Sequence, residues 1–166
     1  MLTWKTWKED HGFYFSLKNW GKAFSLVHNT KLSTDIKWFY YTILYRTAWT
    51  NVKQSYGSDD QEDKWCTICN SCIDQNIFHK YYECLTVKQL MLDLQNFLAI
   101  NFDLEFNIDG DTILIYQIVA KSDNDKIRMV AMIVAAKFSF WRLGLLDSDE
   151  ILHKGLIWIK ALYTLN

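Results

Sequence analysis

WCTICNSCIDQNIFHKYYEC, residues 65–84, contains all four cysteines of the 166-residue chain and one of its four histidines. Within it, Cys66, Cys69, His79 and Cys84 follow the spacing C-x2-C-x9-H-x4-C. Three thiolates and one imidazole suit tetrahedral zinc, and filling all four positions leaves none for water. The spacing therefore predicts a structural zinc site; the alternative is a set of buried cysteines that bind no metal. Cys72 is either a substitute for Cys69 or His79, or a bystander.

The composition is that of a folded protein. Half of the residues are hydrophobic, 16% are aromatic and 22% are charged, a balance unlike that of disordered chains. A chain of this length can bury about two-thirds of its unfolded surface without help from a metal. We therefore expect one domain over residues 1–166, in which zinc organises one corner.

The chain has no proline and only six glycines. Boundaries within this domain are therefore placed at polar clusters and at changes of hydrophobic pattern. The parts are an aromatic and basic helical part (1–53), an exposed polar loop, QSYGSDDQEDK (54–64), the cysteine segment with the helix that follows it (65–98), and short strands with two carboxy-terminal helices (99–166). Each boundary follows a change of composition or of hydrophobic period rather than a proline or glycine signal.

Helical spacing of apolar residues predicts helices over 16–28, 35–49, 85–98 and 126–144, and from about Ser148. Residues 102–106 (FDLEF) alternate strictly and 112–120 (TILIYQIVA) are rich in β-branched residues, so these segments are either short paired strands or extended connections. The predicted fold class is therefore mainly α: a small helical domain with a zinc-knuckle-like insertion and room for one short β-hairpin.

Charge is unevenly distributed although the net charge is -1. Residues 1–54 carry eight Lys and Arg against three Asp and Glu, whereas residues 55–120 carry three against eleven. A basic first third favours contact with phosphate groups. The candidate nucleic-acid-binding residues are the basic and aromatic side chains Lys18, Lys22, Lys31, Lys37, Trp38, Arg46 and Lys53. In the alternative interpretation, the aromatics fill the core and the lysines form a solvated face.

No enzyme is expected from the motifs. The remaining histidines are scattered, and the sequence contains neither a G-x-S-x-G elbow nor a glycine-rich phosphate loop. No segment approaches the ~20 apolar residues that a membrane span needs, and the first residues have no apolar signal region. We therefore expect an intracellular protein, nuclear or cytoplasmic, that does not enter a membrane and whose cysteines are free or metal-bound rather than bridged.

Several weak motifs occur in a recognisable order. Residues 35–51 end in Thr50-Asn51, the cysteine segment carries H-x4-C, VKQLMLDLQNFL (87–98) follows it, and MIVAAKFSFWR (132–142) holds Lys137 and Arg142. From about Trp7 to the end, this order resembles the reverse-transcriptase-associated zinc-binding region at the carboxy-terminal end of LINE-type non-LTR retrotransposon reverse transcriptases. The resemblance implies a structural zinc and an accessory that holds RNA for a polymerase.

The sequence also departs from that family's pattern. Trp49 replaces a proline before Thr50-Asn51, Gln75-Asn76 replaces a Glu-Thr pair, and Leu90 or Met91 stands where the family has a tryptophan. The polymerase motif of metal-binding carboxylates is absent from the sequence. These departures indicate a degenerate or repurposed copy. Two functions follow: a non-catalytic module that binds RNA or single-stranded nucleic acid, or a protein–protein interaction subunit of a larger assembly without nucleic-acid binding.

Overall fold

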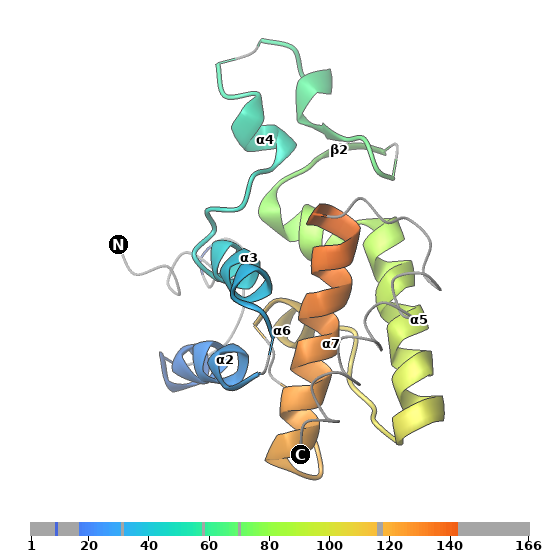
Figure 1. Ribbon diagram of the computed structural model, residues 1–166. Helices are drawn as coiled ribbons and strands as arrows, with labels where there is room; N and C mark the ends of the chain where they lie inside the picture. Colours follow the sequence, from blue (N-terminus) through green and yellow to red (C-terminus); the bar gives the residue numbers. More distant parts are fainter. Residues whose placement is uncertain are drawn as a thin grey trace.

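The computed structural model describes residue 9 and residues 17–30, 32–57, 59–69, 71–115 and 118–142, and helices dominate this part (Figure 1). In chain order the elements are α2 (Leu17–Asn29), α3 (Thr34–Leu44), α4 (Asn51–Gln54), the 3-10 helix η1 (Glu62–Lys64), β1 (Trp65–Cys66), β2 (Ser71–Asp74), the π-helix η2 (His79–Glu83), α5 (Leu85–Phe102), α6 (Gly110–Ile115) and α7 (Asp123–Arg142). The mainly α fold class is confirmed, with one small antiparallel hairpin in the described residues.

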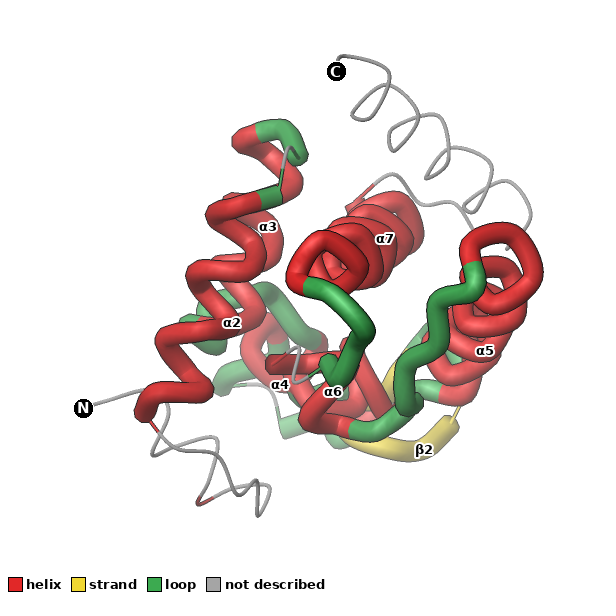
Figure 2. Tube along the Cα trace, turned by 90° about the horizontal axis from the view of Figure 1, so that it is seen from below, coloured by secondary structure: helices red, strands yellow, loops and turns green. Residues whose placement is uncertain are grey.

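α7 is the central helix. All its side chains from Met129 to Lys137 are buried, as its nearly continuous apolar sequence predicts. It contacts α2, α3 and α5, and Figure 2 shows it between α3 and α5. The buried hydrophobic residues of all these helices belong to one core cluster.

α5 confirms the amphipathic helix predicted over residues 85–98 and continues to Phe102. Its buried side chains are Val87, Leu90, Met91, Leu94 and Leu98, which recur at the three- and four-residue spacing of one helical face. The helix ends where Asp103 adopts the left-handed conformation, with φ 54°, a frequent C-terminal stop.

An aromatic junction joins the cysteine segment to the core. Tyr81 of η2 is buried, and its ring contacts Phe39 of α3 and Trp141 of α7, with centroids 6.0 and 5.8 Å apart. Phe39 in turn meets Phe138 of α7 edge to face at 5.5 Å. Such pairs add about 0.5–1.5 kcal/mol each beyond the area that they bury. The turn that carries His79 is therefore anchored to two core helices.

Residues 102–106 and 112–120 were interpreted as either short paired strands or extended connections, and paired strands are wrong for the part of these segments that the structure describes. Residues 103–108 connect α5 to α6 without regular secondary structure, and TILI lies within α6. Ile113 and Leu114 are fully buried there, and the Asp109 carboxylate accepts the Thr112 backbone N–H at 2.7 Å, as a helix N-cap does. Core packing and this cap outweigh the β propensity of the isoleucines. The hairpin, β1 and β2, lies inside the cysteine segment instead.

Three sequence predictions fall outside the described residues: the helix from Ser148, the role of Lys31, and the start of the basic part before residue 9. The loop of residues 54–64 is mostly exposed, with Ser55 buried. In the part of the chain that the structure describes, no helix has the length and apolarity to cross a bilayer.

Candidate metal centre

The hairpin supplies the first two ligand residues. β1 pairs with β2 through Trp65 opposite Asp74 and Cys66 opposite Ser71. Cys66 ends β1 and Cys69 lies in the tight turn that follows, so both thiols of the C-x2-C pair face the same point, as in zinc knuckles. The pair of strands lies with α4 and η1 at the top of Figure 1, above α3, α5 and α7.

A π-helical turn supplies the other two candidate ligand residues, His79 and Cys84. The Cys84 backbone N–H donates to the His79 carbonyl at 2.8 Å, a bond that spans five residues rather than four. In an α-helix, residues five apart differ by about 140° around the axis. The wider π turn brings them back to nearly the same side, and such turns are frequent at functional sites. The H-x4-C spacing therefore suits the η2 geometry.

The four ligand atoms converge. The Sγ atoms of Cys66 and Cys84 lie 4.0 Å apart, Cys69 Sγ lies 3.5 Å from His79 Nε2, and all four atoms lie within 4.8 Å of one another. Cys66, His79 and Cys84 are buried and Cys69 is half-buried. The structure thus brings together all four residues that the spacing selected, in an arrangement that can bind a metal ion. Cys72, exposed on β2, is not one of them.

Zinc fits this arrangement. With Zn–S bonds of about 2.3 Å and Zn–N bonds of about 2.0–2.1 Å, a tetrahedron has edges of about 3.8 Å between sulfurs and about 3.6 Å between sulfur and nitrogen. The observed 4.0 and 3.5 Å are close to these edges. The other separations among the four atoms are at most 4.8 Å.

The thiols have unequal acidities because their surroundings differ. Burial raises the pKa of the Cys69 thiol, but hydrogen bonds from Ser71, His79 and Cys66 outweigh burial and lower the pKa to about 6. Burial raises the pKa of Cys84 to about 11; charge on Cys66 and Cys69 adds to this, and the Val87 and Thr86 amides oppose it. A bound dication would deprotonate every ligating thiol and so release protons.

Two residues around the cluster had no signal in the cysteine spacing. Gln75, 2% exposed, donates from Nε2 to Cys66 Sγ at 3.5 Å, and its Oε1 accepts the Asn51 backbone N–H at 3.3 Å. The Asn51 side-chain amide donates to the Trp65 carbonyl. Gln75 and Asn51 are 24 positions apart in the sequence. The order Thr50-Asn51 before C-x2-C was the only feature of the sequence that pointed to a contact near the cysteines.

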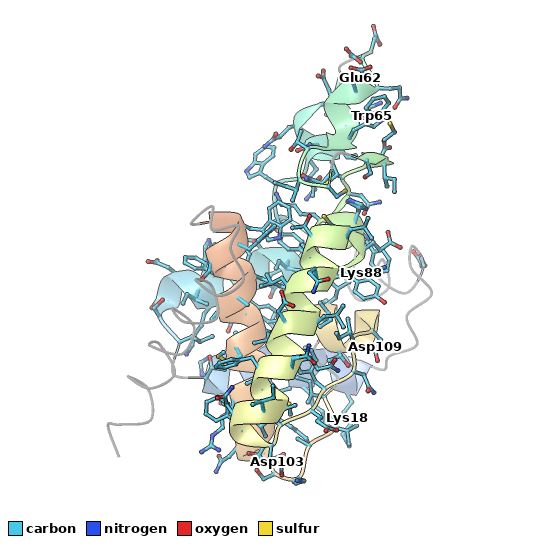
Figure 3. The ribbon with its side chains drawn as sticks, turned by 90° about the vertical axis from the view of Figure 1, so that its right-hand side faces the viewer. Lys18, Glu62, Trp65, Lys88, Asp103 and Asp109 are labelled. Carbon is cyan, nitrogen blue, oxygen red and sulfur yellow. The ribbon has the colours of Figure 1, made fainter. Side chains whose placement is uncertain are left out.

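The predicted nucleic-acid-binding residues do not form one cluster. Lys18 and Lys22 are exposed on α2, and Lys18 lies far from the hairpin that carries Trp65 (Figure 3). Trp38 of α3 is 69% exposed, and its neighbour Lys37 donates from Nζ to the His28 carbonyl at 3.0 Å. Lys18, Lys22, Lys37 and Trp38 therefore belong to the α2–α3 side of the molecule.

Arg46 and Lys53 lie together, closer to the metal cluster. Lys53 Nζ donates to the carbonyls of Arg46 and Ala48; burial and the nearby Arg46 charge lower the pKa of Lys53. Lys80 of η2 donates from Nζ to the Trp49 carbonyl at 2.7 Å, while the Trp49 side chain is 66% exposed. Trp49 and Lys80 were absent from the predicted set, although both are of the residue types that bind nucleic acid.

No protein-family model, no curated protein and no solved structure matches the chain.

Proposed function

We propose that the chain is a non-catalytic, nucleic-acid-binding module organised by a structural zinc ion at Cys66, Cys69, His79 and Cys84. The convergence of these four ligand atoms within 4.8 Å is the observation that carries the proposal. Three sulfurs and one nitrogen favour zinc over the oxygen-seeking cations. Since the protein fills all four positions, the metal would hold the hairpin against η2 rather than act on a substrate.

The charge and exposed aromatics of the amino-terminal helices support nucleic-acid binding. The described residues within 17–57 include five basic side chains and one acidic side chain, Asp35. Tyr45 and Trp49, both more than half exposed, flank Arg46, and Lys53 lies beside it. Flat aromatic rings stack on unpaired bases while cations meet the phosphates, so RNA or single-stranded DNA is the ligand class that this surface suits.

The ordered motifs described above support an origin in a retrotransposon reverse transcriptase. Under that proposal, this chain corresponds to the metal-organised accessory that works beside a polymerase. The polymerase would have supplied further contacts to the nucleic acid, so we expect the isolated module to bind with modest affinity and little sequence preference.

A second candidate function, a subunit of a larger assembly, is favoured by the outer face of α5. Leu85, Leu92 and Ile100 are 70%, 42% and 82% exposed, and spacings of seven and eight residues place them along one stripe of the helix. Exposed apolar residues that line up in this way are typical of protein interaction surfaces.

The test measures binding of a labelled single-stranded RNA to the zinc-loaded chain at several salt concentrations. Phosphate contacts predict that affinity falls steeply as salt rises. We expect Trp49→Ala to weaken binding roughly tenfold, since stacking on one base contributes about 1–3 kcal/mol. Tyr56→Ala is the matched control, because Tyr56 is an exposed aromatic residue near Asp59 and Asp60. Absence of binding at low salt would reject nucleic-acid binding and favour the interaction subunit. Equal losses in both variants would show that the strand does not bind through Trp49.

A further inference from the structure

Gln75 lies between the metal cluster and the segment that carries Trp49. Its side chain is buried and contacts both: Nε2 donates to Cys66 Sγ, and Oε1 accepts the Asn51 N–H. Its own backbone N–H is fixed by the Lys64 carbonyl at 2.7 Å. A buried amide whose donor and acceptor are both used has little freedom to move.

The segment on the far side of Gln75 does not hold itself in place. α4 has only four residues, far too few to be stable as an isolated helix. Within the segment, the Thr50 hydroxyl accepts the Lys53 N–H at 3.3 Å. Its bonds to other parts come from Asn51, which bonds to Gln75 and to Trp65 of β1, and from the Trp49 carbonyl, which accepts from Lys80 of η2 at 2.7 Å. Figure 1 shows α4 beside the hairpin and away from the helical core. The position of residues 49–53 therefore depends on the hairpin and on η2, which carry Cys66 and His79.

We infer that Gln75 is a positioning residue through which metal at the cluster fixes residues 49–53, and with them Trp49 and Lys53 beside Arg46. A metal-bound thiolate at Cys66 is a stronger acceptor for the Gln75 amide than a free thiol, because hydrogen bonds to charged groups are the stronger ones. Partners of metal ligands commonly act in this way. This inference rests on the proposed zinc site and nucleic-acid surface.

One consequence is that nucleic-acid binding depends on the metal although no ligand residue touches the nucleic acid. Metal raises affinity for the single strand by ordering Trp49, and the bound strand must raise the affinity for metal by the same factor. The ordering also lowers the entropy lost when the strand binds.

The experiment follows backbone amide exchange by NMR in the full chain, with zinc and after chelation. The amide at position 51 reports the contact with Gln75, and that of Leu94 in α5 reports global opening. Chelation should accelerate exchange at position 51 roughly tenfold or more, the effect of losing one buried hydrogen bond, with a smaller change at Leu94. Equal acceleration at both positions would overturn the inference, because the metal would then stabilise the whole fold without a specific link.

Gln75→Leu keeps the four ligands and removes the link. We expect this variant to retain zinc by native mass spectrometry, to exchange faster at position 51, and to bind single-stranded RNA several-fold more weakly. Gln89→Leu is the control, since Gln89 is exposed and bonds only to Asp93 among the interactions described. Should Gln75→Leu not fold, Gln75→Asn serves instead, since it keeps the amide but is one methylene too short to reach both partners.

The outcomes separate the inference from the proposed function. A folded Gln75 variant with zinc, protection at position 51 and RNA affinity all unchanged overturns the inference. Loss of zinc from Gln75→Leu but not from Gln89→Leu also overturns it, since Gln75 would then support the metal site itself. If the wild-type chain binds no RNA, the proposed function fails, and the exchange data alone decide whether metal fixes residues 49–53.

Discussion

The backbone N–H of Cys84 donates to the carbonyl of His79 across a π-helical turn, and this bond brings two residues five positions apart to one cluster. Inserting one alanine after Glu83, which is exposed, would place the thiol six residues from His79, and residues six apart in an α-helix differ by about 120° around the axis. We expect the insertion variant to lose the intense visible absorption of tetrahedral Co²⁺ bound to thiolates. Insertion of one alanine after Asp59 in the exposed loop is the control and should preserve it; retention of the absorption in both variants would contradict the geometric argument.

α5 carries one leucine on its core face and one on its outer face, so the two positions can be compared. Leu94 is fully buried and Leu92 is 42% exposed. Truncating a buried leucine leaves a cavity, so Leu94→Ala should lower the free energy of unfolding by about 2–5 kcal/mol. Leu92→Ala should lower it by less than about 1 kcal/mol. Urea denaturation measures both, and similar losses would mean that the face of α5 is assigned wrongly.

Lys137 makes stability depend on pH. It is fully buried, and its ammonium donates to the Ile113 carbonyl; burial lowers its pKa from 10.5 to about 7. Between these values the unfolded chain binds a proton that the folded chain does not, so the free energy of unfolding should rise as pH increases from about 7 towards 10.5. Below about pH 7, Lys137 is protonated in both the folded and the unfolded chain. The gain in the free energy of unfolding that higher pH gives through Lys137 is then absent.

The predicted size of that rise is on the order of a few kcal/mol. Cysteines titrate in the same window, so the comparison with Lys137→Met isolates the lysine. Chemical denaturation across the pH range should give a smaller rise for Lys137→Met than for the wild-type chain. Parallel curves for the two proteins would show that Lys137 keeps its charge when folded.

The Lys80 side chain links η2 to residues 49–53 through a hydrogen bond to the Trp49 carbonyl. Its Nζ lies 2.7 Å from the Trp49 carbonyl and 4.6 Å from the centroid of the Trp141 ring. Lys80 Nζ also lies 5.7 Å from the centroid of the Tyr81 ring. Lys80→Met should therefore cost about 1–2 kcal/mol of stability, from one hydrogen bond and these cation–π contacts. Lys88→Met, which removes a contact at 5.6 Å to Tyr82, should cost less. Thermal unfolding of both variants checks the order, and the reverse order would contradict it.

Helical periodicity located α2 and α5, since each buries a face at three- and four-residue spacing, and the nearly continuous apolar sequence of α7 located the central helix. The strands were misplaced for a physical reason. β1 and β2 have two and four residues, too few for an alternating pattern, while the β-branched residues Thr112 and Ile113 of α6 are buried in a helix. Asp109, three residues before Thr112, was a usable N-cap signal for a helix.

The four residues of the candidate metal cluster were identifiable from spacing because C-x2-C and H-x4-C each indicate a local turn. The link through Gln75 was not, since it joins residues distant in sequence through a buried side-chain amide that has no motif. The basic residues were recognisable by type, but their division between the α2–α3 side and residues 46–53 depends on how the helices pack.

The central claim is that zinc binds at Cys66, Cys69, His79 and Cys84. Native mass spectrometry of the full chain, purified without a chelator, tests it most directly when wild type is compared with Cys84→Ser and Cys72→Ser. We predict one zinc ion in the wild type and in Cys72→Ser, and little or none in Cys84→Ser, together with a lower melting temperature. A metal-free wild-type chain with four free thiols, or equal zinc loss in both variants, would contradict the account.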